Sequence, residues 1–395
     1  MLRHRLRNRW SDFRNIHTVA VGISGGVDSS ASAVLLKREG YNVIGVHMTN
    51  WSHDIEDGNQ CEGRRDAEIA EEVCRQLRIP FHRVAFQKEY WSSVFTEFIT
   101  GLQQGFTPNP DVTCNAKVKF SLFRQYCTDE LGAHSVATGH FARIFPGPTL
   151  VRGADTSVDQ SYFLAQVPRQ NFTNVLFPVG HLSKAAVREV AIQEKLITAN
   201  RPTSTGLCFV GKRRRFPEFL RQFVAETPGR FVDADGRPIG RQHQGQMFYT
   251  IGQRARISGL TEAHFVSRKD GDNIHVVPGR SHPDLFCETI ICSHLNWIDG
   301  DLPAEVDTRD GFQCLLSVRY RSELGRCSLR RLSDGRFEVA MRDLHRAVTP
   351  GQTSVFYSST GVCFGSAFVD ETGPSLYAQG RSVPIGCSGD LIIRP

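Results

Sequence analysis

A short loop, Ser24-Gly25-Gly26-Val27-Asp28-Ser29-Ser30, has residue types that suit the binding of phosphate groups. Glycines let the backbone approach phosphate oxygens, and the amides and dipole of a following helix favour an anion. Serine hydroxyls add donors, and the carboxylate of Asp28 could help to place Mg²⁺. The alternative is a turn that only caps a helix, since Ser and Asp are common capping residues. We favour a nucleotide site, because this pattern is much more specific than a generic glycine turn.

Two of the 11 cysteines stand where nearby residues favour a reactive thiol. Cys114 lies in TPNPDVTCNAKVKF, shortly before two lysines, and Cys208 precedes the basic run 212–215. Neighbouring cations lower the pKa of a thiol and raise the fraction of thiolate. We expect both cysteines on exposed loops, with Pro108 and Pro110 forming an extended turn before Cys114. A small residue of the core is the alternative for any cysteine, and it is the expected state of most of the others.

The elements that must position these residues alternate between strands and helices in the first part of the chain. Compact apolar runs predict strands at 17–24, 41–48, 81–86 and 134–140, and helical patterns occur at 27–40, 67–79, 90–101 and 117–131. This alternation predicts a parallel, doubly wound sheet. Ligands bind beyond the carboxyl ends of the strands in such a sheet. Ser24, Met48 and Gly139 stand at three such ends, so we expect them to line one crevice.

Beyond about residue 200 the pattern changes to short strands that are separated by Gly- and Pro-rich turns. A short helix is expected at 216–225, and strands are expected at MFYTIG, NIHVVPG, CLLSVRY, RFEVAM and TSVFY. This texture predicts small β domains or a barrel. We divide the chain into a catalytic α/β domain at 17–205, a small central domain at 206–283 and a C-terminal β-barrel domain at 284–395.

The composition is that of a globular protein with a mild excess of positive charge. The 395 residues carry a net charge of +6, which permits nucleic-acid binding without proving it. No apolar run approaches the roughly 18 residues of a membrane helix. The cysteines form no CxxC pair and show no zinc spacing, so we expect neither a structural metal nor a disulfide framework. Residues 1–16 are rich in arginine and poor in acids, which predicts a mitochondrial presequence, with a basic tail and a cytoplasmic location as the alternative.

Eight motifs occur in the order that is found in tRNA-specific 2-thiouridylases (the MnmA/TRMU family). They are SGGVDSS, TPNPDVTCN, ATGHFAR, DQSYFL, STGLCFVG, YTIGQR, SVRYR and PGQ, and they extend from about residue 18 to about residue 370. The chain therefore resembles this family, and the stretch from FHRVAFQKEYWSSVF to TPNPDV resembles its mitochondrial members most. SGGVDSS by itself resembles the loop of pyrophosphate-loop ATP pyrophosphatases, which adenylate an oxygen and release pyrophosphate.

The resemblance implies ATP-dependent thiolation of the wobble uridine in the anticodon stem-loop of tRNA. Adenylation turns the uridine 2-oxygen into part of a good leaving group, AMP. Cys208 carries a persulfide from a sulfur-donor protein and attacks the activated carbon, and Cys114 then attacks the bridging sulfur. The two cysteines are left as a disulfide that must be reduced. Asp111 matches the acid/base residue proposed for the family.

The resemblance also implies which residues bind the two substrates. Those that match the family's ATP site are Gly22, Ile23, Ser24, Gly25, Gly26, Val27, Asp28, Ser29, Met48 and Gly139. Those that match its tRNA contacts are Asn109, Pro110, Asp111, His140, Val158, Asp159, Gln160, Arg319, Tyr320 and Gln352. Val158 stands where the family commonly has a lysine, so we expect one phosphate contact to be lost. For His140, a hydrogen-bonded histidine at a strand end is an equal alternative.

The expected partners are thus tRNA, ATP with Mg²⁺, and a persulfide donor. We expect a monomer that does not contact a membrane and holds no metal of its own, and we expect the basic run 212–215 to face phosphates rather than only solvent. Two other function classes remain open. A different pyrophosphate-loop synthetase would share Ser24–Ser30 but would not need Cys114 and Cys208 in these contexts. A tRNA-binding protein without catalysis would tolerate the loss of the loop or of the thiols.

Overall fold

The chain forms two compact units. The computed structural model describes residues 17–51, 62–202, 216–384 and 391–392. The first unit holds the described residues up to Val94 and those from Thr113 to 202, and the second holds Phe95–Val112 and the described residues from Phe216 onward. The segment Phe95–Val112 therefore groups with the C-terminal part of the chain, although its flanking segments group with the N-terminal part. Nothing in the sequence indicates this excursion.

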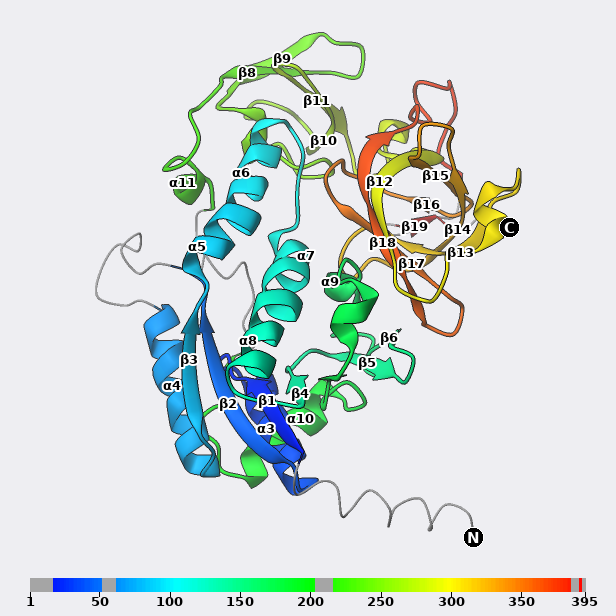
Figure 1. Ribbon diagram of the computed structural model, residues 1–395. Helices are drawn as coiled ribbons and strands as arrows, with labels where there is room; N and C mark the ends of the chain where they lie inside the picture. Colours follow the sequence, from blue (N-terminus) through cyan, green and yellow to red (C-terminus); the bar gives the residue numbers. More distant parts are fainter. Residues whose placement is uncertain (1–16, 52–61, 203–215, 385–390, 393–395) are drawn as a thin grey trace. The chain divides into compact units, whose positions relative to one another are not determined.

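A five-stranded parallel sheet organises the first unit (Figure 1). Its strands in spatial order are β3 (Phe81–Ala85), β2 (Asn42–Thr49), β1 (Thr18–Gly22), β4 (Ser135–Ala137) and β7 (Val175–Leu176). The chain builds outward from β1 to β2 and β3, and then continues on the other side of β1 with β4 and β7. Such a reversal opens a crevice at the carboxyl ends of the two central strands. The sheet confirms the doubly wound α/β class that the sequence predicts.

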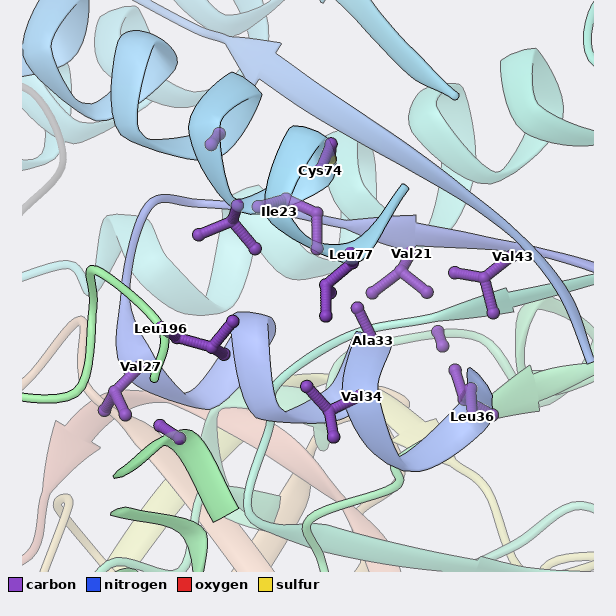
Figure 2. Close-up of a cluster of buried hydrophobic side chains, with 14 of the residues drawn as sticks. Val21, Ile23, Val27, Ala33, Val34, Leu36, Val43, Cys74, Leu77 and Leu196 are labelled. Carbon is purple, nitrogen blue, oxygen red and sulfur yellow. The ribbon is translucent and has the colours of Figure 1, made fainter. Parts of the chain in front are cut away.

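Helices cover both faces of this sheet, because alternate residues of each strand point to opposite faces. Val21 lies in a buried core with α3 (Val27–Arg38), α4 (Glu62–Leu77) and α10 (Lys184–Gln193), and Figure 2 shows it among side chains of α3 and α4. Ala20 lies in the core on the opposite face, with α8 (Arg124–Asp129). The smaller elements of this unit are α5 (Gln87–Tyr90), β5 (Ala142–Phe145), β6 (Thr149–Arg152), α9 (Ser161–Leu164) and a 3₁₀ turn at Arg169–Phe172.

Two helical runs contain π-helical segments. Trp91–Phe95 joins α5 to α6 (Thr96–Gln103), and Asn115–Phe123 joins α7 (Pro110–Cys114) to α8. The helix that is expected at 117–131 therefore begins earlier, at Pro110. Proline is well suited to the first position of a helix, since its fixed φ fits and its missing N–H would have no partner there. The extended stretch that the sequence places across Pro108 and Pro110 accordingly ends before Pro110.

The second unit contains a four-stranded sheet and a closed antiparallel barrel (Figure 1). The sheet has the order β10 (His264–Asp270), β11 (Asn273–Pro278), β8 (Gly229–Val232) and β9 (Pro238–His243). The barrel has the order β12 (Thr289–Trp297), β15 (Phe337–Met341), β14 (Gly325–Arg331), β13 (Phe312–Ser317), β17 (Thr353–Tyr357) and β18 (Cys363–Thr372), and β18 pairs back with β12. Its interior is apolar, with Ile290, Leu316 and Val339 fully buried. The predicted barrel is thus confirmed.

One strand expected in this unit is absent from the described structure. The expected strand at 247–252 is replaced by a 3₁₀ turn at Gln246–Phe248 and a second turn after it, because Gly245 and Gly252 have φ of 147° and 84° and interrupt an extended chain. The remaining elements are α11 (Phe216–Leu220), the pair β16 (Leu344–His345) and β19 (Leu391–Ile392), and 3₁₀ turns at Pro283–Leu285 and Ala304–Asp307. Within the described ranges, none of the helices has the length and apolar character that a membrane span requires.

Candidate active site

The glycine loop lies at the carboxyl end of β1 and leads directly into α3. Gly25 has a φ of 79°, which favours glycine, and Gly26 precedes the first helical residue, Val27. The hydroxyl of Ser29 donates to the carbonyl of Gly26 at 3.0 Å and accepts the amide of Ser24 at 3.1 Å. Ser29 and Ser30 are buried, so their hydroxyls shape the loop itself. The donors that this loop offers to an anion are therefore the first-turn amides of α3, since such amides have no acceptor within a helix.

Gly139 brings the end of β4 against this loop. A Cβ atom at Gly139 would lie 2.6 Å from the amide nitrogen of Ser29 and 2.7 Å from the carbonyl carbon of Asp28. A Cβ atom this close to backbone atoms would clash with them, so only glycine fits at position 139. Since β2, β1 and β4 are adjacent parallel strands, their carboxyl ends meet at one edge, and half-buried Met48 stands near the end of β2. The structure thus brings together the strand ends that the sequence assigns to a nucleotide site.

Four side chains that no motif indicates support the loop. Arg201 donates to the carbonyl of Gly25 at 2.6 Å and to the carboxylate of Asp66 at 2.8 Å, so it ties the loop to α4. The ring of His47 donates from Nδ1 to the carbonyl of Ile23 at 2.8 Å, and burial lowers the pKa of His47, which favours the neutral ring. Arg201 lies seven positions before Cys208 in the sequence.

Lys184 is the fourth supporting residue, after Arg201, Asp66 and His47, and it pairs with Asp28. Its Nζ lies 2.6 and 2.7 Å from the two carboxylate oxygens of Asp28, and both side chains are largely buried. A carboxylate is the ligand type that Mg²⁺ prefers. However, the ammonium of Lys184 already occupies both oxygens, so Asp28 in this arrangement does not fit a resident Mg²⁺. The pair instead fixes the first turn of α3 to the start of α10.

Cys114 lies in a helix rather than on an exposed loop, which corrects the expectation from the sequence. It ends α7 and is 1% exposed. The cause is the local sequence before it: Asn109 accepts the amide of Asp111 at 3.1 Å through its side-chain oxygen, and Pro110 follows as the first helical residue. Residues 206–215 of the predicted central domain lie outside the described residues. They include Cys208 and the basic run 212–215.

His140 follows β4 in a mostly apolar setting. Its Nδ1 lies 2.7 Å from the hydroxyl of Thr138, and its ring packs near those of Phe120 and Phe177. Burial, and secondarily the charge of Lys119, holds the pKa of His140 well below its usual value of 6.5. The imidazole is therefore neutral near pH 7. The hydrogen-bonded setting agrees with the structural alternative for this residue, and a contact with tRNA stays a prediction.

The Val158-Asp159-Gln160 stretch is built around a buried carboxylate. Asp159 is 8% exposed and accepts hydrogen bonds from Arg152 at 2.8 Å and from the amide of Gly153 at 2.8 Å. The side chain of Gln160 accepts the amide of Phe141 at 2.9 Å, and Val158 packs on an apolar cluster with Phe141. These side chains hold the segment to the hairpin of β5 and β6. Their predicted contacts with tRNA remain untested.

The remaining predicted tRNA residues belong to the second unit. Arg319 donates to the carbonyl of Arg346 at 3.1 Å, and Tyr320 carries the guanidinium of Arg321 over its ring at 5.1 Å. The side-chain amide of Gln352 donates to the carbonyl of Thr107. This last contact joins the barrel to the segment that carries Asn109, which belongs to the same unit. No sequence pattern indicates that pairing, because the two residues are 245 positions apart.

Three family models match successive parts of the chain. The tRNA methyl transferase HUP domain matches residues 17–212, the tRNA methyl transferase PRC-barrel domain matches 217–280, and the aminomethyltransferase beta-barrel domain matches 287–369. The three matched segments cover the parallel sheet, the four-stranded sheet and most of the closed barrel, in that order.

Two curated relatives match almost the full chain. A tRNA-specific 2-thiouridylase MnmA from Protochlamydia amoebophila is 41% identical over 94% of this chain and 98% of that protein. A second, from Geobacillus kaustophilus, is 43% identical over 89% of this chain and 95% of that protein. Among solved structures, a 4-thiouridine synthetase–RNA complex with bound ATP matches 52% of this chain and 49% of that chain, with 19% identity and a TM-score of 0.34. A similarity that low supports no functional conclusion.

Proposed function

Because this chain belongs to the family of tRNA-specific 2-thiouridylases, we propose that it uses ATP to replace the 2-oxygen of a tRNA uridine with sulfur. The observation that carries the proposal is the identity of about 40% with such enzymes over nearly their whole length. The position of the Ser24–Ser30 loop at the reversal point of the sheet, against Gly139, supports the use of a nucleotide.

In the proposed reaction, the 2-oxygen of the uridine attacks the α-phosphorus of ATP, and pyrophosphate leaves. The terminal sulfur of a persulfide on Cys208 then attacks C2, and AMP leaves with the former 2-oxygen. Cys114 attacks the Sγ atom of Cys208, the bond between the two sulfur atoms breaks, and 2-thiouridine is released. The enzyme is left with a Cys114–Cys208 disulfide, which a thiol reductant must reduce before the next cycle.

The residues would share this work according to their chemistry. The first-turn amides of α3 would bind the phosphates of ATP, and Asp111 would exchange protons with the uridine. Since Cys114 is 1% exposed, its attack requires a local rearrangement of α7 that exposes the thiol. Mg²⁺ would enter with the phosphates of ATP rather than as a bound metal.

The finer features of the substrate and the setting are also part of the proposal. The target is the wobble uridine of the anticodon stem-loop, the sulfur comes from a separate persulfide-donor protein, and the enzyme acts as a monomer in mitochondria. The arginine-rich composition of residues 1–16 supports the location. A fluorescent protein fused to residues 1–16 should enter mitochondria, and a cytosolic signal would contradict that location.

The direct test is reconstitution with purified protein, ATP, an unmodified tRNA transcript and a chemical persulfide source. We expect 2-thiouridine at the wobble position by mass spectrometry of the digested RNA, together with AMP and pyrophosphate. Formation of ADP would exclude the adenylation step. A parallel reaction that contains a sulfonium methyl donor in place of the persulfide source tests methyl transfer, and a methylated tRNA there would favour the activity named in the descriptions of two family models.

A variant separates this enzyme from a different pyrophosphate-loop synthetase. Cys208→Ser should still consume ATP in the presence of tRNA but form no 2-thiouridine, because adenylation precedes sulfur transfer. If Cys208→Ser forms 2-thiouridine at the wild-type rate, the persulfide role of Cys208 is wrong. If neither protein consumes ATP in a tRNA-dependent manner, the substrate is not tRNA.

A further inference from the structure

The segment Gly105–Thr107 is held by hydrogen bonds to its backbone from two parts of the second unit. On one side, the ammonium of Lys269 in β10 donates to the carbonyl of Gly105 at 2.9 Å. Burial lowers the pKa of Lys269 to about 8, which reflects how far this group is removed from water. Gly105 has a φ of 87°, and a Cβ atom there would lie 3.0 Å from the side-chain oxygen of Gln246. The positive φ and the nearby side chain of Gln246 therefore favour glycine at position 105.

On the other side, the loop before β17 holds the backbone of Thr107 at both of its polar groups. The amide of Thr107 donates to the carbonyl of Pro350 at 2.9 Å, and the carbonyl of Thr107 accepts from the side-chain amide of Gln352. Gly351 lies so close that a Cβ atom there would be 2.8 Å from the Thr107 nitrogen. Lys269 and the loop Pro350–Gln352 thus form a clamp on Gly105–Thr107.

The clamped segment lies immediately before the residues that begin α7. Thr107 is followed by Pro108, Asn109 and Pro110, and the two prolines leave few rotatable backbone angles between the clamp and the helix. Pro108 also packs against Gly101, where a Cβ atom would lie 2.4 Å from its ring. A displacement of Thr107 would consequently move Asn109, whose side chain caps α7 at the amide of Asp111.

We infer that Lys269 and Gln352 are positioning residues that act through Gly105–Thr107 to place Asn109 and Asp111 for the reaction. This inference rests on the proposed function. It assigns to Gln352 a role different from the tRNA contact that the resemblance implies, since its amide group binds a backbone carbonyl of its own chain. A misplacement of a catalytic group by about 1 Å can cost on the order of 100-fold in rate.

The test compares Lys269→Met and Gln352→Leu with wild type in the thiolation assay. We expect kcat to fall by roughly 10- to 100-fold in each variant, while KM and Kd for tRNA stay within about twofold. The kcat of the double variant should be little lower than that of the less active single variant, because both changes release the same segment. The matched control is Gln379→Leu, whose side chain donates to the carbonyl of Pro374 at the surface of the same unit and which should keep wild-type kinetics.

Two outcomes would overturn the inference. A rise in KM and Kd for tRNA with unchanged kcat would make Gln352 a substrate contact, and unchanged kinetics in both variants would remove any role for the clamp. If Gln352→Leu does not fold, the assay uses Gln352→Glu instead, because this nearly isosteric change also removes the donor.

Hydrogen exchange separates this inference from the proposed function. The amides of residues 105–112 should exchange faster in Lys269→Met and Gln352→Leu than in wild type and Gln379→Leu, whether or not the assay detects thiolation. Unchanged exchange would show that Lys269 and Gln352 do not hold the segment. Absence of 2-thiouridine with wild-type protein would instead reject the proposed function.

Discussion

At the scale of single residues, the nucleotide loop depends on close backbone packing as much as on its own sequence. The hydroxyls of Ser29 and Ser30 donate hydrogen bonds to the carbonyl of Gly26, and the guanidinium of Arg201 donates one to the carbonyl of Gly25. The side of the loop that faces β4 is occupied by Gly139. A substitution far from the SGGVDSS motif can therefore disturb the shape of this loop without changing any residue of the motif.

Gly139→Ala provides a test of this packing. The new methyl group would lie 2.6 Å from the Ser29 nitrogen, so the first turn of α3 must move away from its present position. We expect the affinity for ATP to fall by at least about 10-fold, since the first-turn amides would no longer converge on the phosphates. Isothermal titration with a non-hydrolysable ATP analogue measures this affinity.

The control for that variant is Gly40→Ala, in the same unit. A Cβ atom at Gly40 meets nothing within 4 Å, although its φ of 87° disfavours alanine. This variant should lose about 1 kcal/mol of stability and keep its affinity for ATP. Equal losses of affinity in the two variants would show that general destabilisation, rather than the position of α3, controls nucleotide binding.

At the scale of elements, α7 is a short helix whose start carries the residues expected to meet the uridine. Its five residues begin a helical run that continues through Asn115–Phe123 into α8, so the start of that run depends on its cap. Asn109 supplies the cap and Pro110 supplies a favourable first residue. The chain also passes from one compact unit to the other within α7, between Val112 and Thr113.

Substitutions of Asn109 separate capping from substrate contact. Asn109→Ala removes the acceptor for the amide of Asp111 and should cost about 1 kcal/mol of stability and lower kcat. Asn109→Asp keeps an acceptor and should retain most of both. Urea unfolding and steady-state thiolation measure the two effects. If Asn109→Asp is as inactive as Asn109→Ala, the amide group itself contacts the substrate.

A second cap in the same unit is the control for Asn109. His282 accepts the amide of Asp284 at 3.2 Å at the start of the 3₁₀ turn Pro283–Leu285. His282→Ala should lower stability and leave kcat unchanged. A parallel loss of kcat would mean that the reaction responds to any loosening of the second unit.

At the scale of the whole molecule, buried histidines make the fold sensitive to acid. Burial lowers the pKa of His47, His243 and His275, and it lowers the pKa of His345 to about 4, with the charge of Arg319 as a second cause. The folded state therefore holds these rings neutral, while the unfolded chain takes up protons below its pKa of about 6.5. Their contribution to stability is fully present above pH 6.5 and is lost as the pH falls below it, and for His345 this loss continues down to about pH 4.

His345→Gln tests this linkage in the barrel unit. Wild-type protein should lose about 1 kcal/mol through His345 alone between about pH 7.5 and about pH 5.5, because one pH unit below the unfolded pKa corresponds to about 1.4 kcal/mol at most. The variant should lose less over the same interval, since its amide does not titrate. Urea unfolding at the two pH values measures the difference. An identical loss in both proteins would show that folding does not lower the pKa of His345.

Much of the fold follows from local patterns in the sequence. Compact apolar runs locate the strands β1, β2, β3 and β11 to within a few residues, because apolar composition and flanking turn residues are local properties of the sequence. At the start of α7, the local sequence fits two different structures. Asn109-Pro110 reads as a turn next to Pro108, yet the same pair is a favourable cap and first helical residue.

The sequence by itself indicated the chemistry of this protein: a loop whose residue types suit phosphate groups, two cysteines in unusual contexts, and a set of ordered motifs typical of one family. These signals are local, since each depends on the types and spacing of neighbouring residues. The tertiary structure alone decided which distant groups support them. Arg201 with Gly25, Lys184 with Asp28, and Gln352 with Thr107 are separated by 176, 156 and 245 positions. A hydrogen bond over such a separation depends on the path of the whole backbone, so no local pattern of one sequence can indicate it.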